Sequence, residues 1–166
     1  MDNPGGGSRC LVAVRLRGTA RINPELQKTL DSLRLKSKYN AVLLHETSSV
    51  KGMLQRAKDH ITWGEVDADT ILQLLQLRGR TTGNRRIDDG YVKEKFPGYG
   101  SMEKLAEAIA SGEIPLERLW EAEIKPVFRL HPPKGGFKKT IKRPYGSGGE
   151  LGYRGPDIKN LIEKMI

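Results

Sequence analysis

The sequence predicts an α+β protein in which a small β-sheet carries two helices on one face and is followed by a mostly helical extension with a basic loop. Apolar residues first alternate with a period of two, as in a strand, and then recur at the spacing of a helix. This succession is repeated and ends in a third strand-like segment, which gives the order β-α-β-α-β over the first 66 residues. Because each helix is apolar along only one stripe, both are expected on one face of the sheet, and the other face is left for a partner or for the rest of the chain.

Three segments are expected to form the strands of this sheet. Residues 9–17 alternate between an apolar face and a second face that ends in arginines. Residues 41–46 form a short apolar run that is typical of a mostly buried strand, and residues 61–66 return to a β-like composition.

The two intervening segments carry helical signals. Asn23 can cap the first helix with its side chain, and Pro24 suits the first helical position. The apolar stripes consist of Leu26, Leu30 and Leu33 in the first helix and of Val50, Met53, Leu54, Ala57 and Ile61 in the second.

The composition changes after residue 66. Asp67 or Asp69 can cap a third helix, which is followed by the polar stretch 78–89. A further helix is predicted at residues 101–111, where Gly112 ends it. This part of the chain is therefore expected to be helical.

The last segment, residues 125–166, combines three features. An edge strand is predicted within residues 124–131, because Pro126 lacks the N–H group that a central strand needs. The basic stretch 129–154 follows, and Pro156 opens a final helix whose apolar residues keep helical spacing. We expect this helix to be docked on the rest of the chain.

Charge divides the chain in the same way. The net charge is +9, but residues 1–66 contain 11 basic and 6 acidic residues, residues 67–124 contain 8 and 11, and residues 125–166 contain 10 and 3. A strongly basic chain favours a polyanionic partner, and the acidic middle would be repelled by phosphates. We therefore expect a core domain at residues 9–66, a helical, mildly acidic subdomain at 67–124 and a basic arm with its flanking strand and helix at 125–166. The two basic ends are predicted to fold into one basic face.

The basic stretch 129–154 is the main candidate for RNA binding. Its cations can neutralise phosphates, its aromatic rings can stack on unpaired bases, and its glycines and prolines allow a close backbone approach at a reduced entropy cost. A solvated, disordered loop is the alternative, although the predicted final helix favours a loop anchored at both ends. The candidate contacts are Arg129, His131, Lys134, Phe137, Lys138, Lys139, Lys142, Arg143, Tyr145 and Arg154.

Other basic residues give weaker signals. Arg15, Arg17 and Arg21 lie near the end of the first strand, and Lys51 and Arg56 lie on the second helix. Charges on a helix usually form only its solvated face, but together with the basic stretch these residues could form a continuous patch. A third basic cluster could be either an RNA contact or a flexible connector. It consists of Arg78, Arg80, Arg85 and Arg86.

The sequence contains no convincing enzyme, metal or cofactor motif. The glycine run 146–152 lacks the spacing of a dinucleotide-binding loop and the ending of a phosphate-binding P-loop. Three histidines at positions 45, 60 and 131 lack the spacing of a metal site. Asp88 and Asp89 are adjacent carboxylates that more often cap a helix than act as an acid and base. We expect no cofactor and no bound metal.

Cys10 and the hydropathy pattern indicate the cellular compartment in which the protein is expected. A single cysteine cannot form an internal disulfide, and its place on an apolar strand face indicates a buried, inert thiol. The most apolar window, residues 71–77, is far too short to span a bilayer. We expect a cytoplasmic protein without a membrane partner.

Several motifs resemble the archaeal form of the large-subunit ribosomal protein L-thirty family. The resemblance covers nearly the whole chain, and the last two motifs together are specific. The first strand also starts near the beginning of the sequence, without the long basic extension of eukaryotic members. The motifs are Val12–Gly18, Val50–Leu54, Thr62–Glu65, Phe128–Pro133, Ile141–Pro144 and Gly148–Gly152.

The resemblance implies a three-stranded antiparallel sheet with two helices on one face in residues 9–66, and an archaeal and eukaryotic extension in residues 67–166. It also implies a structural constituent of the large ribosomal subunit, present as one copy, which binds ribosomal RNA near the 5S RNA beside neighbouring ribosomal proteins. An RNA chaperone or assembly factor is the alternative. An RNA-processing enzyme that uses Asp88, Asp89 or His131 is a more distant one.

Overall fold

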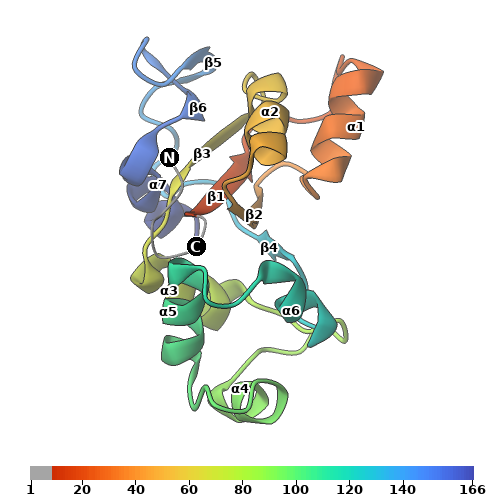
Figure 1. The fold of residues 1–166 in the computed structure, drawn as a ribbon. Helices are drawn as coiled ribbons and strands as arrows, with labels where there is room; N and C mark the ends of the chain where they lie inside the picture. Colours follow the sequence, from red (N-terminus) through yellow and green to blue (C-terminus); the bar gives the residue numbers. More distant parts are fainter. Residues whose placement is uncertain (1–8) are drawn as a thin grey trace.

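The computed structural model describes residues 9–166, which form one mixed sheet with helices on both of its faces (Figure 1). Its strands are β1 (Cys10–Arg15), β2 (Asn40–His45), β3 (Ile61–Glu65), β4 (Val127–Arg129), β5 (Thr140–Pro144) and β6 (Gly149–Tyr153). Its helices are α1 (Pro24–Ser32), α2 (Ser48–Arg56), α3 (Ala68–Arg78), α4 (Asp89–Lys95), α5 (Met102–Ser111), α6 (Leu116–Glu121) and α7 (Ile158–Met165), with a short 3₁₀ helix, η1 (Gly155–Asp157), before α7.

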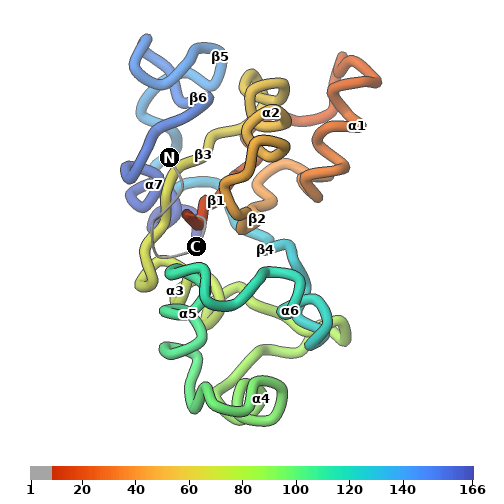
Figure 2. The backbone as a smooth tube through the Cα atoms, viewed as in Figure 1, coloured from red at the N-terminus to blue at the C-terminus, as the bar shows by residue number. Residues whose placement is uncertain are grey.

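The strand order is β4-β2-β1-β3-β6-β5, so the sheet is larger than predicted. Its centre is the expected antiparallel trio, with β1 between β2 and β3. The prediction of a sheet with only three strands was wrong, because β4 extends it antiparallel to β2 and β6 extends it parallel to β3. Figure 2 shows the yellow chain of β3 beside the blue chain of β6, although about ninety residues separate them in the sequence.

Two segments of the stretch predicted as a basic loop, β5 and β6, are therefore strands. Thr62 in β3 donates its hydroxyl hydrogen to the carbonyl of Gly152 over 2.8 Å, and the N–H of Arg154 donates to the carbonyl of Trp63 over 2.9 Å. The sequence of β6 contains glycines at its first and fourth positions, which lowers its local strand propensity. Pairing with a distant strand overrides that local preference.

Both faces of the sheet are covered. On β1, Leu11 and Ala13 face α1 and α2, whereas Cys10, Val12 and Val14 face the larger core formed with the extension. In Figure 1, α1 and α2 lie together on one side of the sheet and α3, α5 and α6 lie below it. The face that was left open in the sequence prediction is thus occupied by the rest of the chain, and every residue of β1 is buried.

The helix starts follow the predicted capping chemistry. The predicted caps Asn23 and Asp67 each accept a hydrogen bond from an N–H group of the first turn, and Asp67 rather than Asp69 caps α3. Ser101 caps α5, and Gly112 ends it with φ 80°. The second helix was predicted to extend to Ile61, which was wrong. The helix α2 ends at Arg56, and Ile61 begins β3.

The C-terminal helix begins slightly later than predicted. Pro156 lies in η1, and α7 follows directly with Ile158, Leu161, Ile162 and Met165 buried. These side chains belong to the larger core, so the helix is docked as expected. Its position fixes the far end of the basic stretch.

One close backbone approach locks η1 to the sheet. A Cβ atom at Gly64 in β3 would lie 1.9 Å from the carbonyl oxygen of Gly155 and 2.9 Å from its carbonyl carbon. Only a residue without a side chain allows this contact. Gly64 therefore permits α7 and the end of β6 to pack on the central strands.

We predict that Gly64→Ala lowers the free energy of unfolding by about 2 kcal/mol or more, because backbone must move to admit the methyl group. Gly52→Ala is the matched control, since Gly52 lies in α2 with nothing within 4 Å of an added Cβ. That change should raise stability by about 0.5–1 kcal/mol through helix propensity. Urea unfolding followed by circular dichroism measures both, and equal effects would contradict the packing described for Gly64.

Candidate nucleic-acid interface

The strongest candidate surface is a group of exposed cations on and before β5, which we call the arm cluster. It lies at the outermost strand of one edge of the sheet. All of its side chains are exposed, and none forms an ion pair with a carboxylate among residues 9–166. The arm cluster consists of Lys138, Lys139, Lys142 and Arg143.

The arm cluster is held in place by β6. The N–H of Lys139 donates to the Glu150 carboxylate over 3.1 Å. A Cβ at Gly149 would lie 1.8 Å from the carbonyl oxygen of Arg143, so the two backbones meet where only glycine fits. These contacts place the cations on an ordered strand edge.

Arg154 has a structural role and is not part of an exposed surface, contrary to the sequence prediction. Its residue exposure is 8%, and its guanidinium is paired with the buried Glu150 carboxylate over 2.9 Å. Its Nε also donates to the Thr62 hydroxyl over 2.7 Å, and Nη2 contacts the Glu150 carbonyl. The guanidinium therefore fastens β6 to β3, and its Nε and Nη2 donors are already used.

Arg15 was also predicted as a contact, but its exposure is 0%. Its guanidinium donates to the carbonyls of Arg17 and Leu35 over 2.8 Å each and to that of Lys36 over 3.1 Å. Burial lowers the pKa of this guanidinium, while the nearby Asp31 opposes the shift. Arg15 organises the chain around the end of β1, so we remove it from the candidate contacts.

The aromatic side chains of the arm are engaged with the protein. Tyr145 is contacted by the guanidinium of Arg154 at 4.8 Å and the ammonium of Lys139 at 5.5 Å from the ring centre. Its hydroxyl donates to Asp157 over 2.7 Å, and this hydrogen bond raises the pKa of Tyr145. Phe137 is half-buried against the larger core. Base stacking on either ring would require these contacts to break.

Two further predicted residues also serve the fold. The ring nitrogens of His131 lie 2.6 Å from the carbonyl of Pro132 and 2.7 Å from that of Ile166, so this side chain binds the end of α7. Lys134 holds the same helix through its backbone, because its N–H donates to the Lys164 carbonyl, while its side chain stays exposed.

The predicted residues near β1 and α2 differ in their exposure and in their partners. Arg17 is half-buried and donates to the Asp59 carbonyl over 3.2 Å, whereas Arg21 and Arg56 are exposed. Lys51 is exposed but pairs with Glu46 over 3.2 Å.

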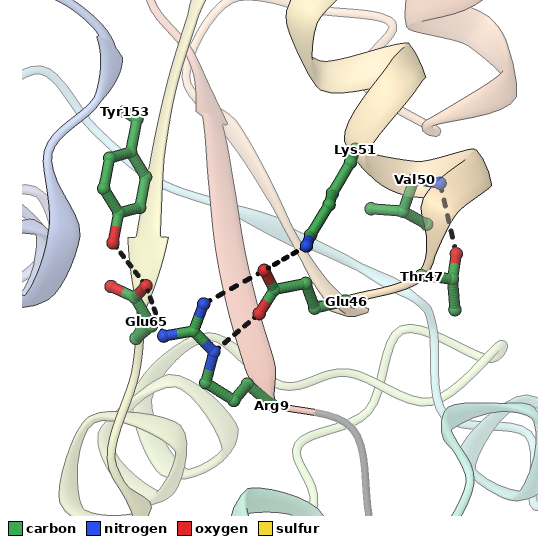
Figure 3. A network of polar contacts seen from close by, with 7 residues as sticks. All are labelled: Arg9, Glu46, Thr47, Val50, Lys51, Glu65 and Tyr153. Atoms are coloured by element: carbon green, nitrogen blue, oxygen red, sulfur yellow. Dashed lines mark hydrogen bonds and ion pairs between the residues drawn. The ribbon is translucent and has the colours of Figure 1, made fainter. Parts of the chain in front are cut away.

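Figure 3 shows the network that engages Lys51. Arg9 makes two contacts to Glu46, of 2.6 and 3.0 Å, and one of 3.0 Å to Glu65, whose other partner is the Tyr153 hydroxyl. The hydrogen bond from Arg9, reinforced by Lys51, lowers the pKa of Glu46. These groups neutralise one another where β1, β2 and β3 meet, which reduces their attraction for a phosphate.

Arg129 lies on β4, at the opposite edge of the sheet from the arm cluster. It lines a cavity of about 1010 Å³ together with Lys36, Lys38 and Lys125, which the sequence prediction did not select. Lys36 and Lys38 are neighbours in the sequence, and the pairing of β4 with β2 brings Lys125 and Arg129 beside them.

The stretch 78–89, left open between contact and connector, is fixed to the body of the protein. Two isolated antiparallel β-bridges join the backbone of Arg80 to that of Arg86 and the backbone of Thr81 to that of Ile124. The N–H of Lys125 also donates to the Arg80 carbonyl over 2.8 Å. The flexible connector is therefore excluded.

The residues considered for catalysis have structural partners. Asp88 accepts from the N–H of Tyr91 and caps α4, as predicted, while Asp89 accepts from the N–H of Met102 at the start of α5, each over 2.8 Å. Cys10 is buried, which raises the pKa of its thiol to about 12. Over residues 9–166, no group of three or more metal-binding side chains is placed to hold an ion. No helix in this range is long and apolar enough to cross a membrane.

The fold and surface define a basic α+β protein that has exposed cations at both outer edges of its sheet, and this charge distribution favours a polyanionic partner. The sequence profile of the family described as ribosomal protein L30p/L7e matches residues 11–61. Proteins named large ribosomal subunit protein uL30 are similar over most of the chain. That of Hyperthermus butylicus is 48% identical over 92% of this chain and 88% of its own length, and that of Methanobrevibacter smithii is 45% identical over 93% and 99%.

The chain therefore belongs to the ribosomal protein L30p/L7e family. The relatives carry the names of ribosomal proteins and not of enzymes, and they are archaeal, which confirms the resemblance drawn from the motifs. The profile covers β1 to the start of β3, whereas the relatives also span α3 to α6 and β4 to β6. The extension is thus shared with these relatives.

We predict that Arg15→Ala lowers the free energy of unfolding by about 2–4 kcal/mol, because it leaves buried carbonyls without their donor. Arg143→Ala, at an exposed position, should change stability by no more than about 0.5 kcal/mol. Thermal and urea unfolding compare the two variants. A loss of stability for Arg143→Ala as large as that for Arg15→Ala would contradict the division between buried and displayed arginines.

Proposed function

We propose that this protein is a structural constituent of the large ribosomal subunit that binds ribosomal RNA near the 5S RNA and stabilises its folded arrangement. The arm cluster is the observation that carries this proposal. Its four cations are exposed, and their strand is positioned by the buried contact between Arg154 and Glu150. A preordered set of cations loses less conformational entropy on binding phosphates than a flexible tail does.

The recognition proposed is mainly of the RNA backbone. Lysine and arginine side chains neutralise phosphates, whereas the rings of Phe137 and Tyr145 are already engaged with the protein. Contacts of this kind position a protein on folded RNA through shape and charge. The neighbourhood of the 5S RNA, the single copy per subunit and the contacts with other ribosomal proteins rest on the family.

The three segments have separate parts in this proposal. Residues 9–66 form the core domain, residues 67–124 form a subdomain that covers one sheet face, and residues 125–166 supply the arm and its anchor. The Arg21, Arg56 and Lys134 side chains, all exposed, are proposed as additional phosphate contacts.

We predict that replacing all four residues of the arm cluster by Ala weakens binding to transcribed large-subunit RNA by about tenfold or more and makes the slope of log affinity against log salt shallower by about four. Fluorescence anisotropy between about 50 and 200 mM salt measures both quantities. The matched control replaces Lys28, Lys93, Lys95 and Lys104, which are exposed on α1, α4 and α5. Similar losses for both variants would show that only net charge matters.

A second measurement separates a structural constituent from an assembly factor. The tagged protein, expressed in its native cell, should co-sediment with mature large subunits at about one copy per particle. The copy number can be determined by quantitative mass spectrometry of the purified particles. Enrichment in immature particles with little in mature ones would instead support an assembly factor.

A further inference from the structure

A second basic surface lies along β4, at the other edge of the sheet. Two adjoining cavities of about 1010 and 200 Å³ share Lys125, Val127 and Arg129. Their outer walls come from the end of α1 with the segment after it and from the end of α3 with the segment after it. We call this surface the β4 groove, and its cations include Lys36, Lys38, Arg78, Arg80, Lys125 and Arg129.

The β4 groove is strongly one-sided in charge. Arg34 adds a seventh cation to its lining, and Asp31 is the only carboxylate there. None of the seven cations forms an ion pair with a carboxylate in the part of the chain that the structure describes. Like charges gathered in a groove repel one another and focus a positive potential, which a polyanion relieves.

Arg34 fixes one rim of the β4 groove through its backbone conformation and a contact with α6. It has φ 63° just after α1, in the left-handed region that glycine usually occupies at a helix end. Its guanidinium stacks on Trp120 of α6 at 4.3 Å from the ring centre. This contact joins the segment that carries Lys36 and Lys38 to the helical extension.

Protection of an exposed strand edge is a simpler explanation for charge on β4, because a cation discourages edge-to-edge pairing. It accounts for Arg129, which lies on the strand itself. It does not account for Lys36, Lys38 and Arg78, which come from other segments and line the same cavities.

The lining also indicates the kind of partner. It contains no aromatic residue, so it offers no platform on which unpaired bases could stack. A protein partner would need apolar or aromatic anchors in buried pockets, whereas the apolar residues here are confined to Pro126, Val127 and Leu130. Phosphates presented in a regular array fit this surface best.

The two basic surfaces are separate. β4 and β5 are the outermost strands of a six-stranded sheet, so five strand spacings lie between them. At roughly 4.8 Å for each spacing, this separation is about 24 Å, well beyond the screening length of about 8 Å at physiological ionic strength. Each surface therefore attracts its own stretch of phosphates.

We infer that the β4 groove is a second RNA-binding surface, which takes the phosphate backbone of a double-stranded RNA segment distinct from the segment bound by the arm cluster. The inference rests on the proposed function, which it deepens, since the protein then bridges two RNA segments across the width of its sheet.

The test compares three variants of the full chain that each lose three positive charges. The groove variant replaces Lys36, Lys38 and Arg129 by Ala, and the arm variant replaces Lys138, Lys139 and Lys142. The control variant replaces Lys93, Lys95 and Lys104, all of which are exposed on α4 and α5. The probes are two 20-base-pair RNA duplexes, one with a donor and one with an acceptor fluorophore, and energy transfer between them reports bridging.

The wild-type and control proteins should bring the two duplexes together, whereas the groove and arm variants should each bind a duplex but lose energy transfer. The groove change should weaken binding of the second duplex by about tenfold or more and make the salt slope of that second binding event shallower by about three. A groove variant that bridges and binds as the control does would overturn the inference and leave the proposed function intact. Failure of the wild-type protein to bind either duplex would contradict both.

Two further comparisons complete the test. Thermal unfolding confirms that each variant is folded, and a Lys36→Gln, Lys38→Gln variant repeats the comparison without a change in β4, because both residues lie in an exposed segment. A polyglutamate peptide is the competing probe. If the groove variant loses binding of this peptide but still bridges the two duplexes as the control does, the groove serves an acidic protein partner and the inference is wrong.

Discussion

The arrangement of the basic segment depends on the buried contact between Arg154 and Glu150, whose guanidinium also donates to Thr62 on β3. Burying two charges is costly, and the cost is offset here because the guanidinium also has backbone and hydroxyl partners. Removing one partner of such a pair typically costs about 3–5 kcal/mol. The contact holds β6 in the sheet, and β6 in turn positions both the arm cluster and the approach to α7.

Covering both faces of the sheet determines where the protein can display charge. The apolar residues of β1 point alternately into two cores, so neither face of the central strands is open to a large partner. The outer strands β4 and β5 are the parts of the sheet that remain accessible to a partner. A protein with cations at two opposite edges of its sheet is suited to lying between folded RNA segments, where each edge can meet a different stretch of backbone.

The sequence predicted those helix ends whose capping groups lie within one turn of the helix. The caps at Asn23 and Asp67 and the stop at Gly112 were identifiable because each satisfies backbone groups within one turn. The strands β5 and β6 were missed, since their stability comes from distant partners. The same reason explains the buried arginines: Arg15 resembles a surface residue until its carbonyl partners are brought around it by the fold. The β4 groove was invisible for the same reason, because no window of the sequence contains it.

The central claim, that RNA covers the two edges of the sheet, can be tested by lysine reactivity. The rate of amine modification would be measured by mass spectrometry for the free protein and for the protein within large subunits from its native cell. Lys36 and Lys38 at one edge and Lys138 and Lys139 at the other should be protected in the subunit, whereas Lys93 on α4 should be less protected than any of them. Equal or greater protection of Lys93, with both edges still reactive, would contradict the account.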